Sequence, residues 1–345
     1  MNKTILYIGS LASWSNSFRR FKALKNICEH TEAIDTDPYI LPKLISGFQH
    51  HLNTGPGVFL LNLKIRRQIS RKKYDIVWVD NKPYLSNKSL QYIKLMQPSV
   101  KIADVLTDDP FGRFTRSWPL LKRTITLYDA FFVQREVNIL ELKNKGANHV
   151  GLCYRSFDPG YNRPLKLLEE DSLEYKTPVG FVGTFEIERA SYIAYLIQNN
   201  VPVKVTGNDW PGAAYWDIIK PFYCGPSVYG EDYIKTINGM DIALHFLRHG
   251  NRDEQDSRTF EIPACKVFML AERSELHCRL FSENEEAAYF TTKEELLEKV
   301  KFFLTAKEQR ERIALNGYNK CFSAGYDHES RIKQILHTIT ELDSN

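Results

Sequence analysis

The sequence lacks three patterns that would each assign a class of protein. Its six cysteines form no Cys-x-x-Cys pair and no metal-ligand spacing with histidine, which argues against a disulfide framework and a zinc site. No apolar run approaches the roughly 20 residues that span a bilayer. The loop after the first apolar run, "GSLASWSNSFRR", has only Gly9 of the G-x-G-x-x-G pattern, so a Rossmann-type dinucleotide site is disfavoured.

The charge is present but unevenly distributed. Residues 1–160 hold 24 Lys and Arg against 13 Asp and Glu, whereas the whole chain of 345 residues has a net charge of only +4. A change of sign along a chain of this length indicates two domains with different partners. The basic residues gather at 18–22, 64–73 and 112–123, interleaved with apolar ones. This pattern suits an anionic membrane surface or a polyanion, although ordinary solvated helix faces produce it too.

Strand-like apolar runs alternate with helical patterns in both halves. This alternation predicts an α/β fold with two doubly wound, Rossmann-like domains facing a cleft. We expect domains at 1–160 and 161–327, a linker at 155–177, and a C-terminal helix in 328–345 that packs back towards the first domain. The predicted strands are 5–9, 74–80, 101–106, 129–134, 149–154, 179–185, 201–207, 241–247, 266–272 and 287–292. The predicted helices are 15–28, 59–72, 87–96, 117–127, 135–146, 188–199, 229–239, 258–265, 293–304, 307–317 and 328–342.

Ligands of such sheets bind where strands end and helices begin, so the loops after the strands hold the candidate residues. After the first strand, Gly9 permits close backbone approach and Ser10 or Ser13 could donate to an acceptor substrate; a plain loop capped by a serine remains the alternative. After the strand at 101–106, Asp108 and Asp109 are candidate general bases. A turn cap is the alternative for this pair.

In the second half, two loops have the composition of a phosphate site. In "GTFEIER", Gly183 and Thr184 would let a phosphate approach the backbone, and Arg189 would provide a counter-charge in the first turn of the next helix. In "TGNDWPG", Gly207 and Asn208, with a tryptophan nearby, could flank a base or ribose. Each signal is weak alone, and together they predict a nucleotide-diphosphate pocket.

The segment "DSRTFEIPACKVFMLAE", residues 256–272, changes abruptly from polar to apolar. Its acidic and hydroxyl residues can cap a helix, whose positive end then carries Arg258 and Thr259 in reach of a diphosphate. Glu261, one turn later, could accept two ribose hydroxyls. The apolar remainder predicts a strand buried on both faces.

The stretches "SRTFEIPAC", "VFMLAERSEL" and "EEAAYFTTKEELLEKVKFFL" resemble the C-terminal module of the CgeB-like (spore maturation protein-like) glycosyltransferases, relatives of the group-1 enzymes of GT-B fold. The similarity extends to "VGFVGTF", "VYGEDY", "DIALHF" and "TDDP", and covers most of residues 74–330.

The resemblance implies roles for individual residues. Glu261 would bind the donor ribose and Arg258 the diphosphate. Asp253 stands where the family places an acid that approaches the donor sugar, although its side chain is shorter. Lys266 occupies a position at which the family usually has glycine, and it would supply charge to the phosphates. Glu286 matches a family acid whose task does not follow from its chemistry.

The resulting hypothesis is transfer of a sugar from a nucleotide-diphosphate sugar to a hydroxyl, without a metal or other cofactor. The acceptor would be a glycan or lipid-linked molecule bound by the basic first domain, in preference to a nucleic acid, during surface polysaccharide or lipopolysaccharide synthesis. We expect a cytoplasmic protein, placed at the inner face of the membrane by contact with anionic lipid. Two alternatives are a glycosyltransferase that modifies DNA bases and a non-catalytic coat or assembly protein that retains the fold.

Overall fold

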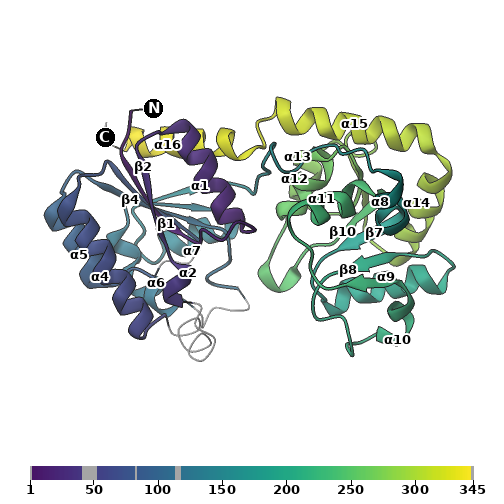
Figure 1. Cartoon of the computed structure of the whole chain (residues 1–345), viewed down its shortest axis with the longest axis horizontal. Coiled ribbons are helices and arrows are strands. Elements are labelled where there is room, and N and C mark those ends of the chain that lie inside the picture. Colours follow the sequence, from purple (N-terminus) through teal and green to yellow (C-terminus); the bar gives the residue numbers. More distant parts are fainter. Residues whose placement is uncertain (1, 41–52, 82–83, 113–117, 343–345) are drawn as a thin grey trace. The chain divides into compact units, whose positions relative to one another are not determined.

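The computed structural model describes residues 2–40, 53–81, 84–112 and 118–342. The chain divides into two compact units (Figure 1). The first unit comprises residues 1–155, 249–252 and 328–345, and the second comprises 156–248 and 253–327. The last helix of the chain therefore belongs to the unit that begins at the N-terminus.

The first unit is built on a six-stranded parallel sheet with the order β2-β1-β3-β4-β5-β6. Its strands are Ile5–Gly9 (β1), Thr31–Asp35 (β2), Ile76–Asp80 (β3), Lys101–Leu106 (β4), Ala130–Val133 (β5) and His149–Leu152 (β6). Ile5 pairs with Thr31 of β2 on one side and Ile76 of β3 on the other. The inner strands β1, β3 and β5 are buried throughout, as expected where helices cover both faces.

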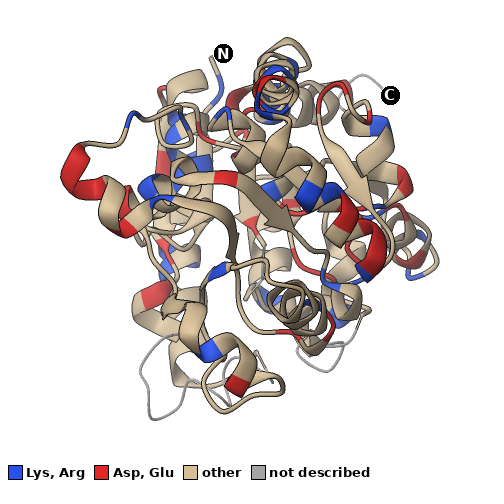
Figure 2. Ribbon diagram, turned by 90° about the vertical axis from the view of Figure 1, so that its right-hand side faces the viewer, with Lys and Arg blue, Asp and Glu red and all other residues tan. Residues whose placement is uncertain are grey.

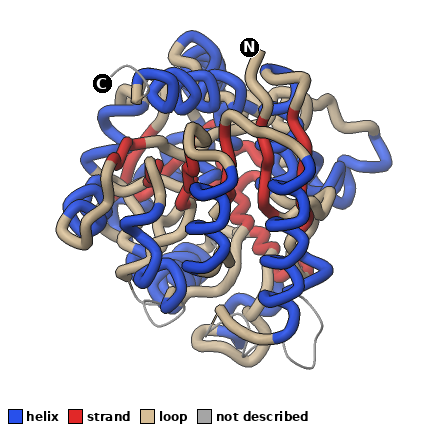
Figure 3. The backbone as a smooth tube through the Cα atoms, turned by 90° about the vertical axis from the view of Figure 1, so that its left-hand side faces the viewer, coloured by secondary structure: helices blue, strands red, loops and turns tan. Residues whose placement is uncertain are grey.

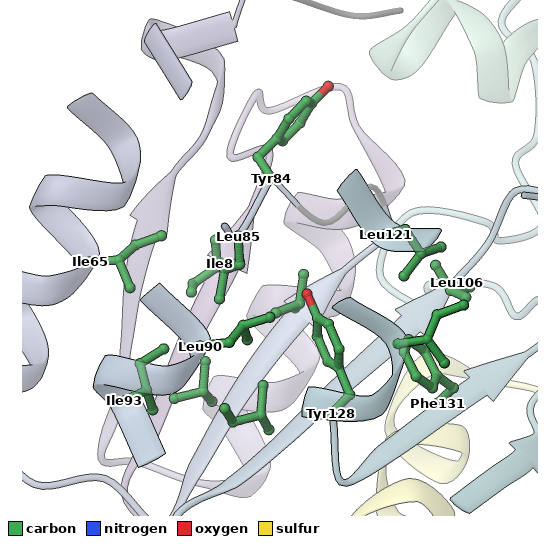
Figure 4. Close-up of a cluster of buried hydrophobic side chains, with 14 of the residues drawn as sticks. Ile8, Ile65, Tyr84, Leu85, Leu90, Ile93, Leu106, Leu121, Tyr128 and Phe131 are labelled. Atoms are coloured by element: carbon green, nitrogen blue, oxygen red, sulfur yellow. The ribbon is translucent and has the colours of Figure 1, made fainter. Parts of the chain in front are cut away.

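Alternate residues of these strands pack against different helices. On one face, side chains such as Ile8 and Leu106 meet Ile65, Leu90 and Leu121 (Figure 4). On the other face, α1 and α16 contribute to a second buried cluster around the middle of the sheet. Figure 3 shows these strands side by side with helices around them. The helices are Asn16–Ile27 (α1), Asp37–Ile40 (α2), Pro56–Arg71 (α4), Asn87–Met96 (α5), Pro119–Thr124 (α6), Glu136–Lys143 (α7) and His328–Glu341 (α16).

The second unit also has a six-stranded parallel sheet, with the order β12-β11-β10-β7-β8-β9. Its strands are Thr177–Val182 (β7), Lys204–Thr206 (β8), Tyr223–Gly225 (β9), Met240–His245 (β10), Phe268–Glu272 (β11) and Ala288–Phe290 (β12). Its helices are Glu169–Tyr175 (α8), Ile187–Gln198 (α9), Trp216–Ile219 (α10), Gly230–Asn238 (α11), Ser257–Ala264 (α12), Glu275–Leu280 (α13), Lys293–Thr305 (α14) and Lys307–Ser323 (α15). The two-sheet α/β prediction is confirmed.

The sequence prediction departs from the structure in several places, and the helices α2, α8, α10 and α13 were not predicted. The segment 155–177, expected to be a linker, is part of the second unit from Ser156 onwards, contains α8, and is tied to α11 where the backbone N–H of Leu165 donates to the Asn238 side chain. The strands β2 and β9 were not predicted.

Most charged residues lie on helices and loops (Figure 2), as expected for sheets with covered faces. Part of the basic segment 112–123 falls at 113–117, outside the described residues. Among the described helices, none has the length and hydropathy of a membrane span.

Candidate functional site

In the second unit, the strand order reverses between β7 and β10. These two neighbours are parallel, and the chain leaves them towards opposite ends of the sheet, β8 lying on one side and β11 on the other. The loops after β7 and β10 therefore lead in opposite directions from adjacent strand ends. This is the place where open α/β sheets bind ligands, because loops and helix N-termini converge there without a helix covering them.

The helix α12 starts at this edge with a capping box. The carboxylate of Asp256 accepts a hydrogen bond from the backbone N–H of Arg258 at 2.7 Å, and the hydroxyl of Thr259 accepts one from the backbone N–H of Asp256 at 3.1 Å. The Thr259 hydroxyl also lies 2.9 Å from Nε2 of the buried His277, and its side chain is fully buried. The prediction that Thr259 binds a diphosphate does not fit, since its hydroxyl is engaged in holding the helix start.

Two arginines converge at the same edge. Arg189, in the first turn of α9, is buried and donates to the carbonyls of Thr184 at 3.1 Å and Leu247 at 3.3 Å. Burial lowers the pKa of Arg189, and the nearby positive charge of Arg258 lowers it further. Arg258 follows the cap of α12, and its guanidinium lies 3.9 Å from the carboxylate of Asp256. Two cations that repel each other at the positive ends of two helices favour an anion between them.

Both guanidinium groups retain an unused donor. The Nε atoms of Arg189 and Arg258 are buried and have no hydrogen-bond partner among the described residues. An unpaired buried N–H of a charged group is costly. These Nε atoms are closed off from solvent, so a ligand would meet the other nitrogens of Arg258, whose side chain is 30% exposed. The two arginines therefore place positive charge at this edge of the sheet, which favours a phosphate nearby.

His245 was not singled out from the sequence. It is the last residue of β10 and is fully buried, with Nε2 placed 2.9 Å from the carboxylate of Asp256. Although burial raises the pKa of Asp256, His245 and Arg258 hold it far below its usual range. The sequence signal was a single histidine at the carboxyl end of the apolar strand in "DIALHF". His245 thus fastens the cap of α12 to the central strand and positions Arg258.

Glu261 lies one turn after Arg258 and is buried. One of its oxygens, Oε2, accepts a hydrogen bond of 2.5 Å from the hydroxyl of Tyr233 on α11, and the other has no partner among the described residues. Burial, followed by the charge of Glu261, raises the pKa of Tyr233 well above its ordinary value. The free oxygen could accept ribose hydroxyls, and the ribose role of Glu261 stays a prediction.

The predicted glycines serve backbone packing. Gly207 has φ +154°, and a Cβ there would lie 1.9 Å from the carbonyl oxygen of Gly183. The same oxygen accepts the indole N–H of Trp210 at 2.8 Å, so Trp210 is buried in the core and does not flank a base. The Asn208 side chain accepts from the backbone N–H of Ser227 at 3.0 Å.

The structure therefore brings together one group of the predicted donor residues. The contacts of Gly183 with Gly207, and of Thr184 with Arg189, place both loops at the edge where Arg258 lies. Asp253 is partly buried, and its backbone N–H donates to the carbonyl of Arg248 at 3.4 Å. Glu286 accepts from the backbone N–H of Ser282 at 2.8 Å, within a local turn.

The structure corrects the predicted role of Lys266. It follows the C-terminal end of α12, where its backbone N–H donates to the carbonyl of Pro263 at 2.8 Å, and it precedes β11. It therefore lies at the opposite end of the helix from Arg258, and the predicted contact with the donor phosphates does not fit. Its φ of +57° explains why glycine suits this position, since a left-handed residue must end the helix here.

Lys266→Gly is expected to raise the free energy of unfolding by about 0.5–1 kcal/mol, because glycine adopts the left-handed conformation without the steric cost that a side chain incurs. Urea unfolding would measure this as a higher midpoint at unchanged slope. Lys266→Ala is the matched control, since alanine removes the charge and keeps the strained Cβ. An equal gain in both variants would assign the effect to charge and not to the backbone.

In the first unit, the structure separates the two adjacent aspartates. The Asp109 side chain is fully buried and accepts hydrogen bonds from Arg252 at 2.6 and 2.9 Å and from the Asn138 amide at 2.9 Å. Burial raises its pKa, but the hydrogen bonds from Arg252, the Phe111 backbone and Asn138 outweigh this and lower it. A general-base role for Asp109 does not fit, since its oxygens are occupied and its affinity for a proton is reduced.

Asp108 is the more accessible of the pair. Its side chain is 50% exposed, it accepts from the Asn81 amide at 3.0 Å, and the Arg155 guanidinium lies 3.7 Å away. A carboxylate with this exposure can exchange protons with a bound hydroxyl. Asp108 thus remains the candidate base on this unit.

The loop after β1 is mainly structural. A Cβ on Gly9 would lie 2.8 Å from the Ser17 hydroxyl, so this glycine permits close packing. The Ser10 hydroxyl donates to Asp37 at 2.6 Å, and Ser15 caps α1 by accepting from the backbone N–H of Phe18 at 3.0 Å. Ser13 is exposed, so an acceptor contact of Ser13 remains a prediction.

One protein family matches part of the chain, mostly within the second unit. Residues 189–337 match the family model described as "Glycosyl transferase-like". This region, less than half of the chain, is similar to glycosyltransferases. It contains both Arg189 and the whole capped helix α12. No curated protein matches the chain.

Solved structures show the same fold over the whole chain. The glycosyltransferase from Rickettsia africae ESF-5 is 14% identical with a TM-score of 0.68, covering 100% of this chain and 99% of that one. Anabaena HepE in complex with UDP-glucose is 14% identical with a TM-score of 0.64, covering 99% and 100%. Sucrose-phosphate synthase from Thermosynechococcus elongatus is 10% identical with a TM-score of 0.65, covering 99% and 100%. The fold is GT-B.

Proposed function

We propose that the chain transfers a glycosyl group from a nucleotide-diphosphate sugar to a hydroxyl acceptor. The observation that carries this proposal is the pair of neighbouring arginines, Arg189 and Arg258, whose charges repel each other at the switch point of the second sheet. A diphosphate supplies oxyanions for both. Its placement beside the first turns of α9 and α12 adds the favourable ends of two helix dipoles.

The donor nucleotide proposed for a first test is uridine diphosphate. Anabaena HepE has been solved with UDP and glucose and with UDP-glucose. In this chain Glu261 would accept the ribose hydroxyls through its free oxygen, while its other oxygen stays with Tyr233. The hydroxyl of Tyr233 thereby fixes the carboxylate in one orientation.

Charge builds up on the leaving diphosphate as the glycosidic bond breaks. Arg189 and Arg258 would stabilise that charge in a partly desolvated site, where such interactions are strongest. We propose that this makes a metal unnecessary for transfer. In an inverting reaction Asp108 would accept the proton of the attacking hydroxyl, and in a retaining reaction the departing phosphate would take it.

For the acceptor we propose a glycan or lipid-linked molecule in surface polysaccharide or lipopolysaccharide synthesis. The excess of Lys and Arg in residues 1–160 supports an anionic partner for the first unit, at the inner face of a membrane. The motif "SRTFEIPAC" supports a CgeB-like branch of the glycosyltransferases.

Thermal unfolding with UDP-, GDP-, ADP-, CMP- and dTDP-sugars tests the proposal. A ligand at 100 times its Kd stabilises the native state by about 2.7 kcal/mol, so the true donor should raise Tm clearly above the others. A protein whose Tm responds to none of these compounds would contradict the proposed activity and support the non-catalytic alternative.

A further inference from the structure

The first unit contains a cavity of about 520 Å³ that the donor site does not use. It is lined by residues of α4, of the segment before α4, of the start of α5 and of α6. This volume lies in the range of cavities that hold small ligands. All the residues that line this cavity lie within the first unit.

The charged residues of this cavity are all basic. Arg66, Lys88 and Arg123 line it, and none of the described lining residues is acidic. Within the described part of the chain, none of these three cations forms an ion pair. Because like charges around a small volume repel one another, the cavity has an unbalanced positive potential that an anion would neutralise.

Arg66 is held in place by buried polar contacts. Its Nε donates to the hydroxyl of Ser89 at 3.2 Å; Ser89 is fully buried and lies 3.1 Å from the Ser86 hydroxyl. The buried Asn62 completes this support by donating to the Tyr84 carbonyl at 2.8 Å and accepting from the Ser86 backbone N–H at 2.8 Å. A guanidinium fixed by one nitrogen keeps its remaining donors available for a ligand.

The rest of the lining combines favourable backbone ends with apolar surface. Helix α4 starts after Gly55 without a side-chain cap, so its first N–H groups are not satisfied by a capping side chain. Val58, Phe59 and Leu120 supply apolar surface in the same cavity, and the Phe59 side chain is 62% exposed. An anionic group joined to an apolar body would match both parts.

We propose that this cavity binds a phosphate group of the acceptor, with the apolar part of the acceptor lying over Val58, Phe59 and Leu120. The proposal rests on the proposed function, which requires an acceptor on the first unit, and it narrows that acceptor to a phosphorylated amphiphile. Arg66 and Arg123 can bind phosphate oxygens through paired N–H groups, and Lys88 adds a point charge.

Binding of hexyl phosphate to the whole chain tests the proposal. Hexanol is the uncharged control probe, and UDP is present to occupy the donor site. We expect Lys88→Glu/Arg123→Glu to weaken the affinity for hexyl phosphate by roughly tenfold or more. The matched control is Arg71→Glu/Lys73→Glu, which makes the same change in net charge at exposed residues outside the cavity. The control should change the affinity by no more than about twofold.

Equal binding of hexyl phosphate by the two double variants, or no binding by the unmodified protein, would overturn the proposal. Vesicles of phosphatidylcholine with and without phosphatidic acid identify the source of the phosphate. Retention on phosphatidic acid that only the cavity variant loses assigns a membrane lipid. Binding of hexyl phosphate without retention assigns a soluble phosphorylated acceptor. The Tm response of the unmodified protein to nucleotide sugars is measured in parallel. If no nucleotide sugar raises its Tm, the proposed donor site is contradicted. If a nucleotide sugar raises Tm but hexyl phosphate does not bind, only the proposed phosphate cavity is contradicted.

Discussion

Arg258→Ala is expected to lower kcat for glycosyl transfer by about 10²–10³-fold, the usual loss when one preorganised donor to developing negative charge is removed. The leaving diphosphate would lose one of two guanidinium groups at the switch point. Folding should survive, because the cap of α12 uses the backbone N–H of Arg258 and not its side chain. Steady-state kinetics with the donor found by thermal unfolding would measure the change.

Stability separates this functional role from a structural one. The Nε of Arg258 is buried without a partner among the described residues, so truncation removes an unfavourable group and the free energy of unfolding should stay equal or rise. Arg312→Ala provides a control at an exposed arginine of α15, and it should leave both kcat and stability unchanged. Strong destabilisation by Arg258→Ala, or unchanged turnover, would remove Arg258 from the site.

Asp104→Asn is expected to raise the free energy of unfolding at pH 7. Asp104 lies in the middle of β4, fully buried, and neither carboxylate oxygen has a hydrogen-bond partner among the described residues. Burial raises its pKa well above the ordinary value, and the charge of Asp80 adds to this. Asparagine has nearly the same shape and cannot ionise, so it avoids the cost of keeping this group neutral.

The effect of Asp104 on stability should depend on pH, and its sign follows from the two protonation states. The folded protein holds a proton on Asp104 that the unfolded chain releases above pH about 3.9, so this residue destabilises the fold increasingly as pH rises from there to its folded pKa. The advantage of Asp104→Asn should therefore be large at pH 7 and small near pH 4. Urea unfolding at both values measures it, with the exposed Glu298→Gln as a control. A difference that does not depend on pH would show that Asp104 is not neutral in the fold.

The strands could be predicted where burial leaves a mark on composition. Runs such as "DIVWV" and "VFMLA" are apolar because their strands are covered on both faces. The missed strands β2, "TEAID", and β9, "YCG", are edge strands with partly exposed residues, so their sequences carry no apolar run. Half-exposed strands at a sheet edge are indistinguishable from loops by this signal.

Some features of the candidate site could also be predicted from the sequence, and others could not. Cap chemistry is local, so the helix start at Asp256 and the placement of Arg258 in its first turn followed from the order of residues along the chain. The proximity of Arg189 to Arg258 did not, because the two residues belong to different helices that only the parallel pairing of β7 and β10 brings together. His245 acquired its role because the loop after β10 brings the cap of α12 back to the end of that strand.

The sequence by itself determined the α/β class, the approximate extent of both sheets and the segment that begins at Asp256, since periodicity, burial and capping are encoded by near neighbours. Only the tertiary structure decided between Asp108 and Asp109, because the distant Arg252 and Asn138 occupy Asp109 alone. It also revealed that Lys266 ends a helix at the far side from the phosphate site. Hydrogen bonding and charge depend on which groups fold into contact, and that information is not local in the chain.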